Sequence, residues 1–326
     1  VPALLIIGQF LDALHSGKYD INKVALIITQ TGGGCRASNY IYLLRKALKK
    51  AGLEQVPVIS VNMSGLESAS GFKLTVPLVR QIIASLVYGD CIMCVSNQTR
   101  PYEFKKGTTD ALIEKWNDAL IEQFNRGQGL SNKDMRKNLA AIVDDFDAIE
   151  RSREKKTRVG VVGEILVKYQ PDANNHVVDV IESQDCEAVV PGIMEFMTTR
   201  PYITDWNEKY LGTGGNKTLY ALMRWSLDRY NAPIKAAIAT SHGKFKQDDP
   251  MPELVEKAAE VTSIGVQAGE GWLLTAEILE LIEQGCPNVI CAQPFACLPN
   301  HVTGRGMFGK IRRLHPAANI VSIDYD

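Results

Sequence analysis

The chain has 326 residues, enough for two α/β domains of the usual size of about 100–200 residues each. Hydrophobic residues make up 45% of it and charged residues 22%, which allows a substantial core. The 36 Lys and Arg residues nearly balance the 37 Asp and Glu residues, with neither sign gathered in a long block, so we expect no nucleic-acid binding and no binding to anionic membranes. The longest apolar runs are only several residues, far below the ~20 that a membrane-spanning helix needs.

The cysteines and the start of the chain predict the compartment. Seven cysteines, an odd number in a large chain, argue against a secreted disulfide framework and for a reducing environment. The apolar run at 3–7 follows Val1 directly, without a basic region before it or a small-residue cleavage site after it, so a secretory signal is not supported. We predict a cytoplasmic protein with free or metal-bound thiols, and a chain that is part of a longer polypeptide.

The first half of the chain predicts a parallel α/β domain at 1–155 with a helical insertion at about 72–155. Its β-rich runs and helical periodicities give, in chain order, a strand over 24–29, a helix over 37–51, a strand over 56–61 and helices over 74–93, 110–124 and 131–154. A strand, a helix and a strand in succession favour parallel pairing. Ser131 is the predicted N-cap of the last helix.

The second half predicts another α/β domain at 156–326, with a helical insertion at about 200–262. Its expected elements are a strand over 159–162, a helix over 174–183, a strand over 188–190, helices over 220–230, 253–262 and 275–284, a strand over 289–291, a helix over 306–314 and a strand over 320–323. The predicted architecture is therefore two Rossmann-like or flavodoxin-like domains with parallel sheets.

Two cysteines occupy analogous positions in these two domains. Cys35 ends the glycine-rich loop 30–35 between a strand and a helix, and Cys297 follows the strand 289–291 and precedes a helix. Ligand sites of open α/β sheets lie at the carboxyl ends of strands, and a helix N-terminus is expected to lower the pKa of a thiol. Thiolates from separate loops can hold an iron–sulfur cluster across an interdomain cleft.

Other interpretations of these segments stay open. Cys35 can be a small buried residue at an anion-binding loop, and Cys297 a packed core thiol. The glycine loop can cradle phosphate, although it lacks the spacing of the common nucleotide-binding motifs. Cys91 and Cys94 form a CxxC pair, which suits redox chemistry, metal binding or core packing.

Two further side chains near the second thiol are candidates for acid/base chemistry or for supporting a bound group. These are His301 and Glu270; the alternatives are a surface histidine and a helix-capping carboxylate.

Several long strings resemble the acyl-CoA dehydratase activase-related proteins. They are QTGGGCRASNYIYLLRKAL at 30–48, TRPYE at 99–103, VGEILVKYQPDANN at 162–175, GEGWLLTAE at 269–277 and CAQPFACLPNHVTGRGM at 291–307. The resemblance runs along essentially the whole chain and concerns the C-terminal part of such proteins, which is related to the 2-hydroxyglutaryl-CoA dehydratase subunits.

The resemblance implies a cysteine-bound [4Fe–4S] cluster. In such dehydratases an activator hydrolyses ATP and sends one electron to the cluster, and the reduced centre generates a ketyl radical on the thioester before water is eliminated. The residues implied here are Cys35 and Cys297 as cluster ligands, Gly32, Gly33 and Gly34 as positions of close backbone approach, and Glu164 as a residue lining the same cleft. Cys94 is kept as a further candidate ligand, and a third ligand upstream of this chain is the alternative. ATP hydrolysis is expected in activase domains outside this sequence.

We therefore predict an oxygen-sensitive, dehydratase-like protein that takes part in ATP-driven electron transfer to an acyl-CoA thioester, with Glu164 and His301 as candidate catalytic residues. A dehydratase or activase domain is the expected protein partner, and an oligomer is possible. The competing predictions are a non-catalytic redox or docking module for a dehydratase and a metal-free nucleotide- or CoA-binding α/β domain.

Overall fold

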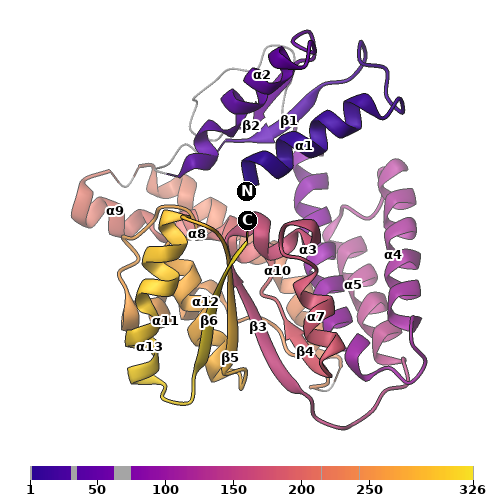
Figure 1. Ribbon diagram of the computed structural model, residues 1–326. Coiled ribbons are helices and arrows are strands. Elements are labelled where there is room, and N and C mark those ends of the chain that lie inside the picture. The colour runs from indigo at the N-terminus through magenta and orange to yellow at the C-terminus, as the bar shows by residue number, and fades with distance from the viewer. Residues whose placement is uncertain (1, 31–34, 62–74, 214, 242, 326) are drawn as a thin grey trace.

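The computed structural model describes residues 2–30, 35–61, 75–213, 215–241 and 243–325. The chain folds into a small N-terminal α/β unit, a helical bundle and a larger α/β unit (Figure 1). It contains two sheets, of two and four strands, and every strand pair in them is parallel. The predicted mixed α/β class with parallel sheets is therefore confirmed.

The N-terminal unit is one strand–helix–strand unit covered by an additional helix. Its elements are α1 (Pro2–His15), β1 (Leu26–Thr29), the short 3₁₀ helix η1 (Arg36–Asn39), α2 (Tyr40–Lys50) and β2 (Val58–Val61). The apolar side of α2 buries Leu44 and Leu48 against Leu14 of α1 and Leu26 of β1. The predicted strand, helix and strand are thus present, and α1 is an element that we did not predict.

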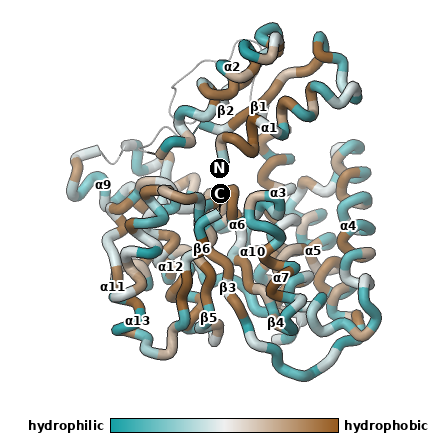
Figure 2. Tube along the Cα trace, in the orientation of Figure 1, coloured by the Kyte–Doolittle hydropathy of each residue, from teal (hydrophilic) through white to brown (hydrophobic). Residues whose placement is uncertain are grey.

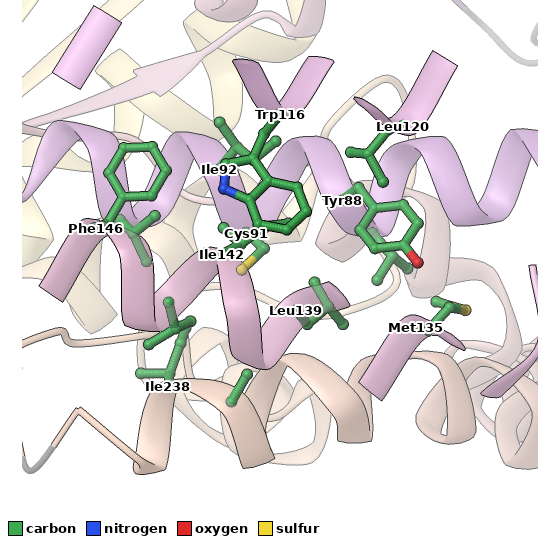
Figure 3. Close-up of a cluster of buried hydrophobic side chains, with 14 of the residues drawn as sticks. Tyr88, Cys91, Ile92, Trp116, Leu120, Met135, Leu139, Ile142, Phe146 and Ile238 are labelled. Atoms are coloured by element: carbon green, nitrogen blue, oxygen red, sulfur yellow. The ribbon is translucent and has the colours of Figure 1, made fainter. Parts of the chain in front are cut away.

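The helical bundle is built around a long central helix. Its members are α3 (Val76–Asn97), α4 (Thr108–Asn125), α5 (Asn132–Asp147), α8 (Ile193–Tyr202) and α10 (Lys217–Ala239). Figure 3 shows how Tyr88 and Cys91 of α3 lie among Trp116, Phe146 and Ile238 from three neighbouring helices. Cys91 is fully buried there, in agreement with the core-packing interpretation of this cysteine.

The boundaries of α5 test the predicted helix at its two ends. Ser131 is its N-cap and accepts a hydrogen bond from the backbone N–H of Asp134 at 3.1 Å, as predicted. The predicted end at 154 is wrong, because the helix stops at Asp147. Arg151 beyond it pairs with Asp147 and forms an antiparallel bridge with Glu103, which holds the chain extended on its way to the large sheet.

The bundle joins the helices of both predicted insertions in one core. Met135 and Leu139 of α5 belong to the same cluster of buried side chains as Ala237 and Ile238 of α10, and α10 packs against α5 and α3. Residues 76–147 and 193–239, which the sequence analysis assigned to two domains, are therefore neighbours in space.

One stretch in the described part of the chain, Val76–Tyr102, is long and apolar enough to cross a membrane by length and composition alone. The core helix of a globular protein passes the same test. This stretch contains α3, whose residues Ala84, Val87 and Val95 are fully buried in the bundle core.

The larger α/β unit contains a four-stranded parallel sheet with helices on both faces. Its strands are β3 (Thr157–Gly163), β4 (Cys186–Val189), β5 (Asn288–Pro294) and β6 (Asn319–Tyr325), in the order β4-β3-β5-β6. Figure 2 shows the apolar character of the central strands. The helices α6 (Ile165–Tyr169) and α7 (Val177–Ser183) cover one face, and α11 (Met251–Val261), α12 (Trp272–Glu283) and α13 (Phe308–Leu314) lie on the other.

Short elements complete the connections. They are η2 (Arg100–Tyr102), η3 (Pro171–Ala173), α9 (Thr204–Leu211), the π-helical turn η4 (Asn300–Gly304) and the 3₁₀ turn η5 (Arg305–Met307).

The direction in which the chain adds strands to this sheet reverses between β3 and β5, although the two strands are parallel. From β3 the chain runs to β4 on one side of it, and the next strand of this sheet, β5, pairs with the opposite side. Connections leave the two strands toward opposite sides at such a point, which is where open α/β sheets bind ligands; we call the region at the carboxyl ends of β3 and β5 the crevice. This end of the large sheet faces the N-terminal unit in Figure 1.

Candidate functional site

The carboxyl end of β3 is shaped by a glycine. Gly163 has φ +138°, and a Cβ there would lie 1.8 Å from the carbonyl oxygen of Ala292 in β5, so only glycine fits. The next residue, Glu164, is the N-cap of α6, and its carboxylate accepts a hydrogen bond from the backbone N–H of Val167 at 3.0 Å. Glu164 is therefore fixed at the mouth of the crevice.

The carboxyl end of β5 carries Cys297 on a tight turn. Ala296 has a left-handed backbone with φ +60°, and the N–H of Cys297 donates to the carbonyl of Pro294 at 3.1 Å. The carbonyl of Cys297 in turn accepts from the N–H of His301 at 3.0 Å. The half-buried thiol thus projects from a turn that is held at both ends.

Glu270, in the loop before α12, connects these two strand ends. One of its carboxylate oxygens accepts from the backbone N–H of Ile165 at 2.9 Å, and the other accepts from Nδ2 of Asn300 at 2.8 Å. The same amide nitrogen of Asn300 lies 3.4 Å from Sγ of Cys297. Asn300 is fully buried, and its Oδ1 has no hydrogen-bond partner. Glu270 and Asn300 therefore tie the second thiol to the end of β3.

Cys35 reaches the same place from the N-terminal unit. It is the N-cap residue of η1, is half-buried, and interacts electrostatically with both Glu164 and Glu270. The phenol of Tyr40, at the start of α2, interacts with Glu164, Cys35 and Cys297. The two predicted cysteines and the predicted Glu164 thus lie close enough to interact electrostatically with Glu270 or with one another.

The electrostatics of this crevice disfavour anions. Burial, with the negative charges of Glu270 and Glu164, raises the pKa of Cys35 against the opposing N–H groups of Ala37 and Arg36. Burial, with the charge of Glu270, likewise raises the pKa of Cys297 to about 11, although Asn300 opposes it.

The same causes act on the other groups of the crevice. Burial, with the charge of Glu164, raises the pKa of Glu270 to about 7, and the pKa of the Tyr40 phenol rises to about 12. The prediction that helix N-termini lower the thiol pKa is therefore wrong for Cys35 and Cys297. The 3₁₀ turn after Cys35 has only four residues, and desolvation outweighs its N–H groups.

The remaining predicted site residues take different positions. His301 is half-buried on η4, with Nδ1 3.5 Å from Nε2 of Gln293, and that amide also donates to Asp324 at 2.6 Å. Cys94 lies in the bundle, where its Sγ contacts the carbonyl oxygen of Lys246 at 3.2 Å, and the structure does not bring it to the two thiols of the crevice. The predicted Gly32, Gly33 and Gly34 lie outside the described residues.

The donor set of the crevice consists of two thiols, two carboxyl groups and a buried amide oxygen without a partner. Thiolates are the protein ligands of iron–sulfur clusters, and carboxylates also bind iron. Cys35 and Cys297 are therefore side chains of the type that such a cluster takes as ligands, and a bound cation would offset the negative charges that raise the pKa of both thiols. A third thiol, that of Cys291 in β5, is fully buried and interacts electrostatically with Glu270 and Cys297. Within the described ranges, the three ligating side chains that lie within 4.8 Å of one another are instead Glu195, Asp248 and Glu280.

Some residues of the crevice were not predicted. Asn300 was part of a motif string without an assigned role, and Tyr40 was read only as part of a helix. Both follow a cysteine at a short interval, Asn300 at i+3 and Tyr40 at i+5, and this spacing is the signal that the sequence offered.

Comparisons with known proteins give no relative. The chain matches no family model, no curated protein and no solved structure. The site is therefore interpreted from its own residues.

Proposed function

We propose that this chain is a cytoplasmic, iron–sulfur, 2-hydroxyacyl-CoA dehydratase-like module, with Cys35 and Cys297 as ligands of a [4Fe–4S] cluster. The flavodoxin-like strand order of the large sheet and the crevice at its β3/β5 reversal support this proposal. When bound, the cluster would supply single electrons of low potential to an acyl-CoA thioester. ATP hydrolysis belongs to an activase partner in this proposal.

The observation that carries the proposal is the convergence of Cys35 and Cys297 on Glu164 and Glu270. The two cysteines come from different units of the fold and from opposite ends of the chain, yet the same two carboxyl groups act on both thiols. Two soft ligands that meet from separate loops are expected of a metal centre and are unnecessary in a site that holds only a phosphate.

The protein's own groups would handle the proton that leaves with the hydroxyl group of the substrate. Glu270 has a pKa of about 7, so it is present in both protonation states near neutral pH, as an acid/base group must be. Its hydrogen bonds from Ile165 and Asn300 hold both carboxylate oxygens in place. In this assignment Glu164 lines the crevice. His301 supports the turn that carries Cys297, because its backbone N–H donates to the carbonyl of Cys297.

The test is anaerobic reconstitution of the chain with iron and sulfide, followed by absorption and EPR spectra. We expect a cluster signal in the wild type that is lost in both Cys35→Ser and Cys297→Ser. Cys186→Ser is the matched control, because this thiol lies at the start of β4, at the opposite end of the sheet strands, where it contacts the carbonyl of Gln184.

Two results would contradict the proposal. A colourless wild type after reconstitution would favour the metal-free α/β domain, and a signal that survives both serine variants would move the cluster away from the crevice. A cluster that forms normally but never passes electrons to a CoA thioester when a dehydratase activator and ATP are present would identify a redox or docking module.

A further inference from the structure

A second group of acidic side chains lies deeper in the molecule, between the helical bundle and the large sheet. Glu195 lies in the first turn of α8, Asp248 in the segment between α10 and α11, and Glu280 near the end of α12. One carboxylate oxygen of each lies within 4.8 Å of the others. Three separate segments thus bring their carboxyl groups to one point.

Two of the three residues of this triad are buried, Asp248 is partly buried, and their carboxyl groups are only partly satisfied. The exposed fraction of Glu195 is 8% and that of Glu280 is 1%. Both oxygens of Glu195 and Oε2 of Glu280 have no hydrogen-bond partner. A buried carboxylate without a hydrogen-bond partner is destabilising, so these oxygens call for a binding partner.

Two oxygens of the triad accept hydrogen bonds from backbone N–H groups outside it. Oδ2 of Asp248 accepts from the N–H of Gly192 at 3.0 Å, and Oε1 of Glu280 accepts from the N–H of Asp249. Backbone groups therefore hold Asp248 and Glu280 in position, while Glu195 and Glu280 keep buried oxygens without a hydrogen-bond partner.

The neighbouring charges do not neutralise the triad. Glu277, one turn before Glu280, is paired with the buried ammonium of Lys168 at 2.8 Å. Asp90 of α3 accepts from the N–H groups of Ile193 and Met194 at 3.0 and 2.9 Å. Lys168 also acts electrostatically on Glu195 and Asp248, but its ammonium is already paired with Glu277.

We propose that Glu195, Asp248 and Glu280 bind a hard divalent cation of the Mg²⁺, Mn²⁺ or Ca²⁺ class. Such cations take oxygen ligands at about 2.0–2.6 Å, so any two oxygens bound to one ion lie at most about 5 Å apart, a limit that the triad meets. The three ligating groups are all carboxylates, which favours these ions over zinc, whose usual ligands include nitrogen or sulfur.

The bound ion would connect three parts of the fold. It ties the start of α8 in the bundle to the segment before α11 and to α12 on the large sheet. Since α12 begins two residues after Glu270, the ion would also fix the helix that follows the acid/base candidate. This proposed cation site does not depend on the proposed function of the crevice.

The test is titration of the full chain with Mn²⁺ after removal of metals by EDTA, read by EPR and by isothermal titration calorimetry. The Cys35→Ser/Cys297→Ser double variant serves as the background, so that metal cannot bind the crevice thiols. We expect one Mn²⁺ per chain, a rise in melting temperature on its addition, and competition by Mg²⁺ and Ca²⁺.

In the same background, Glu195→Gln should weaken Mn²⁺ binding by at least about tenfold. Glu283→Gln should leave it unchanged, since Glu283, on α12 with Glu280, is half exposed and pairs with Lys257. No Mn²⁺ binding at millimolar concentration would overturn the proposal, and a Glu195→Gln variant that melts higher than its parent in EDTA would then show that protons satisfy the triad. Equal Mn²⁺ affinity in Glu195→Gln and its parent would also overturn it.

Discussion

The crevice at the ends of β3 and β5 and the acidic triad beneath the bundle are both places where burial opposes negative charge, but they differ in donors and in access. The crevice combines half-buried thiols from two units with carboxyl groups, whereas the triad contains carboxylates alone, and two of its three residues are buried. Soft donors at an accessible rim suit a redox centre that must meet a partner, and hard donors in the interior suit an ion that stays in place. Accessibility and the type of donor atom thus distinguish a reactive site, which the crevice suits, from a structural ion site, which the triad suits.

The largest expected effect tests how strongly the deep region depends on charge balance. Lys168→Met should destabilise the fold by about 3–5 kcal/mol, because it leaves the carboxylate of Glu277 buried without its partner. The free energy of unfolding from urea titration measures this. Lys217→Met is the matched control, since its bond to Glu208 has the same length of 2.8 Å but lies on the surface, and we expect no measurable change there.

A Lys168→Met variant as stable as the wild type would show that Glu277 is protonated in the native protein. In that case the deep region would hold less negative charge than its side chains suggest, and the contrast with the crevice would weaken.

The next effect concerns the pH dependence of the crevice. The pKa of Glu270 in the folded protein is about 7, above its ordinary value of 4.5, so the folded state binds this proton more tightly than the unfolded state. The stability from this proton is fully present below about pH 4.5 and is lost as the pH rises through 7. Wild type relative to Glu270→Gln should therefore lose about 1–3 kcal/mol between pH 5 and pH 8, measured by urea unfolding at each pH.

Glu283→Gln is the control for that experiment, because its carboxylate belongs to the same helical region but lies outside the crevice. A stability difference between wild type and Glu270→Gln that stays constant from pH 5 to pH 8 would remove Glu270 as a group that titrates near neutrality, and with it the proposed acid/base role.

The smallest expected effect is on thiol reactivity. With a pKa of about 11, Cys297 carries little thiolate at pH 8, so alkylation by iodoacetamide should be at least about tenfold slower than for an ordinary thiol with a pKa of ~8.5. Mass spectrometry of the metal-free protein against a free cysteine peptide measures the rate. Glu164→Gln should speed the reaction of Cys297, since it removes one of the negative charges that disfavour the thiolate. Faster alkylation in wild type than in the peptide would mean that the crevice stabilises anions after all.

Most of the fold was predictable because its signals are local. The strands β3 and β5 are short apolar runs, and α2 shows the helical spacing of Ile41, Leu44 and Leu48, all buried. The helices without such signals were missed: α6 has only five residues, and α8 contains a proline. The common core of α5 and α10 could not be predicted, because periodicity gives the apolar face of a helix and not its partner.

The candidate site was predictable only where it depends on strand ends. Glu164 and Cys297 follow strands of the large sheet, so topology alone brings them to one edge of it. Cys35 follows a strand of the small sheet, and its approach to them depends on how the two units pack, which local sequence does not contain. The role of Asn300 comes from tertiary packing that local sequence does not contain. The triad had one sequence signal, since α12 is apolar nearly all round and its Glu277 and Glu280 could not avoid burial.

The discontinuous bundle has a consequence for how the protein is made. The helices α3 to α5 leave the ribosome roughly 90 residues before α10 is complete, which at about 5–20 residues per second means a delay of several seconds. During that interval the faces of α3 and α5 that α10 covers stay in contact with water, which makes the nascent chain a ready substrate for chaperones. The step that sets the yield of folded protein is then the arrival of α10.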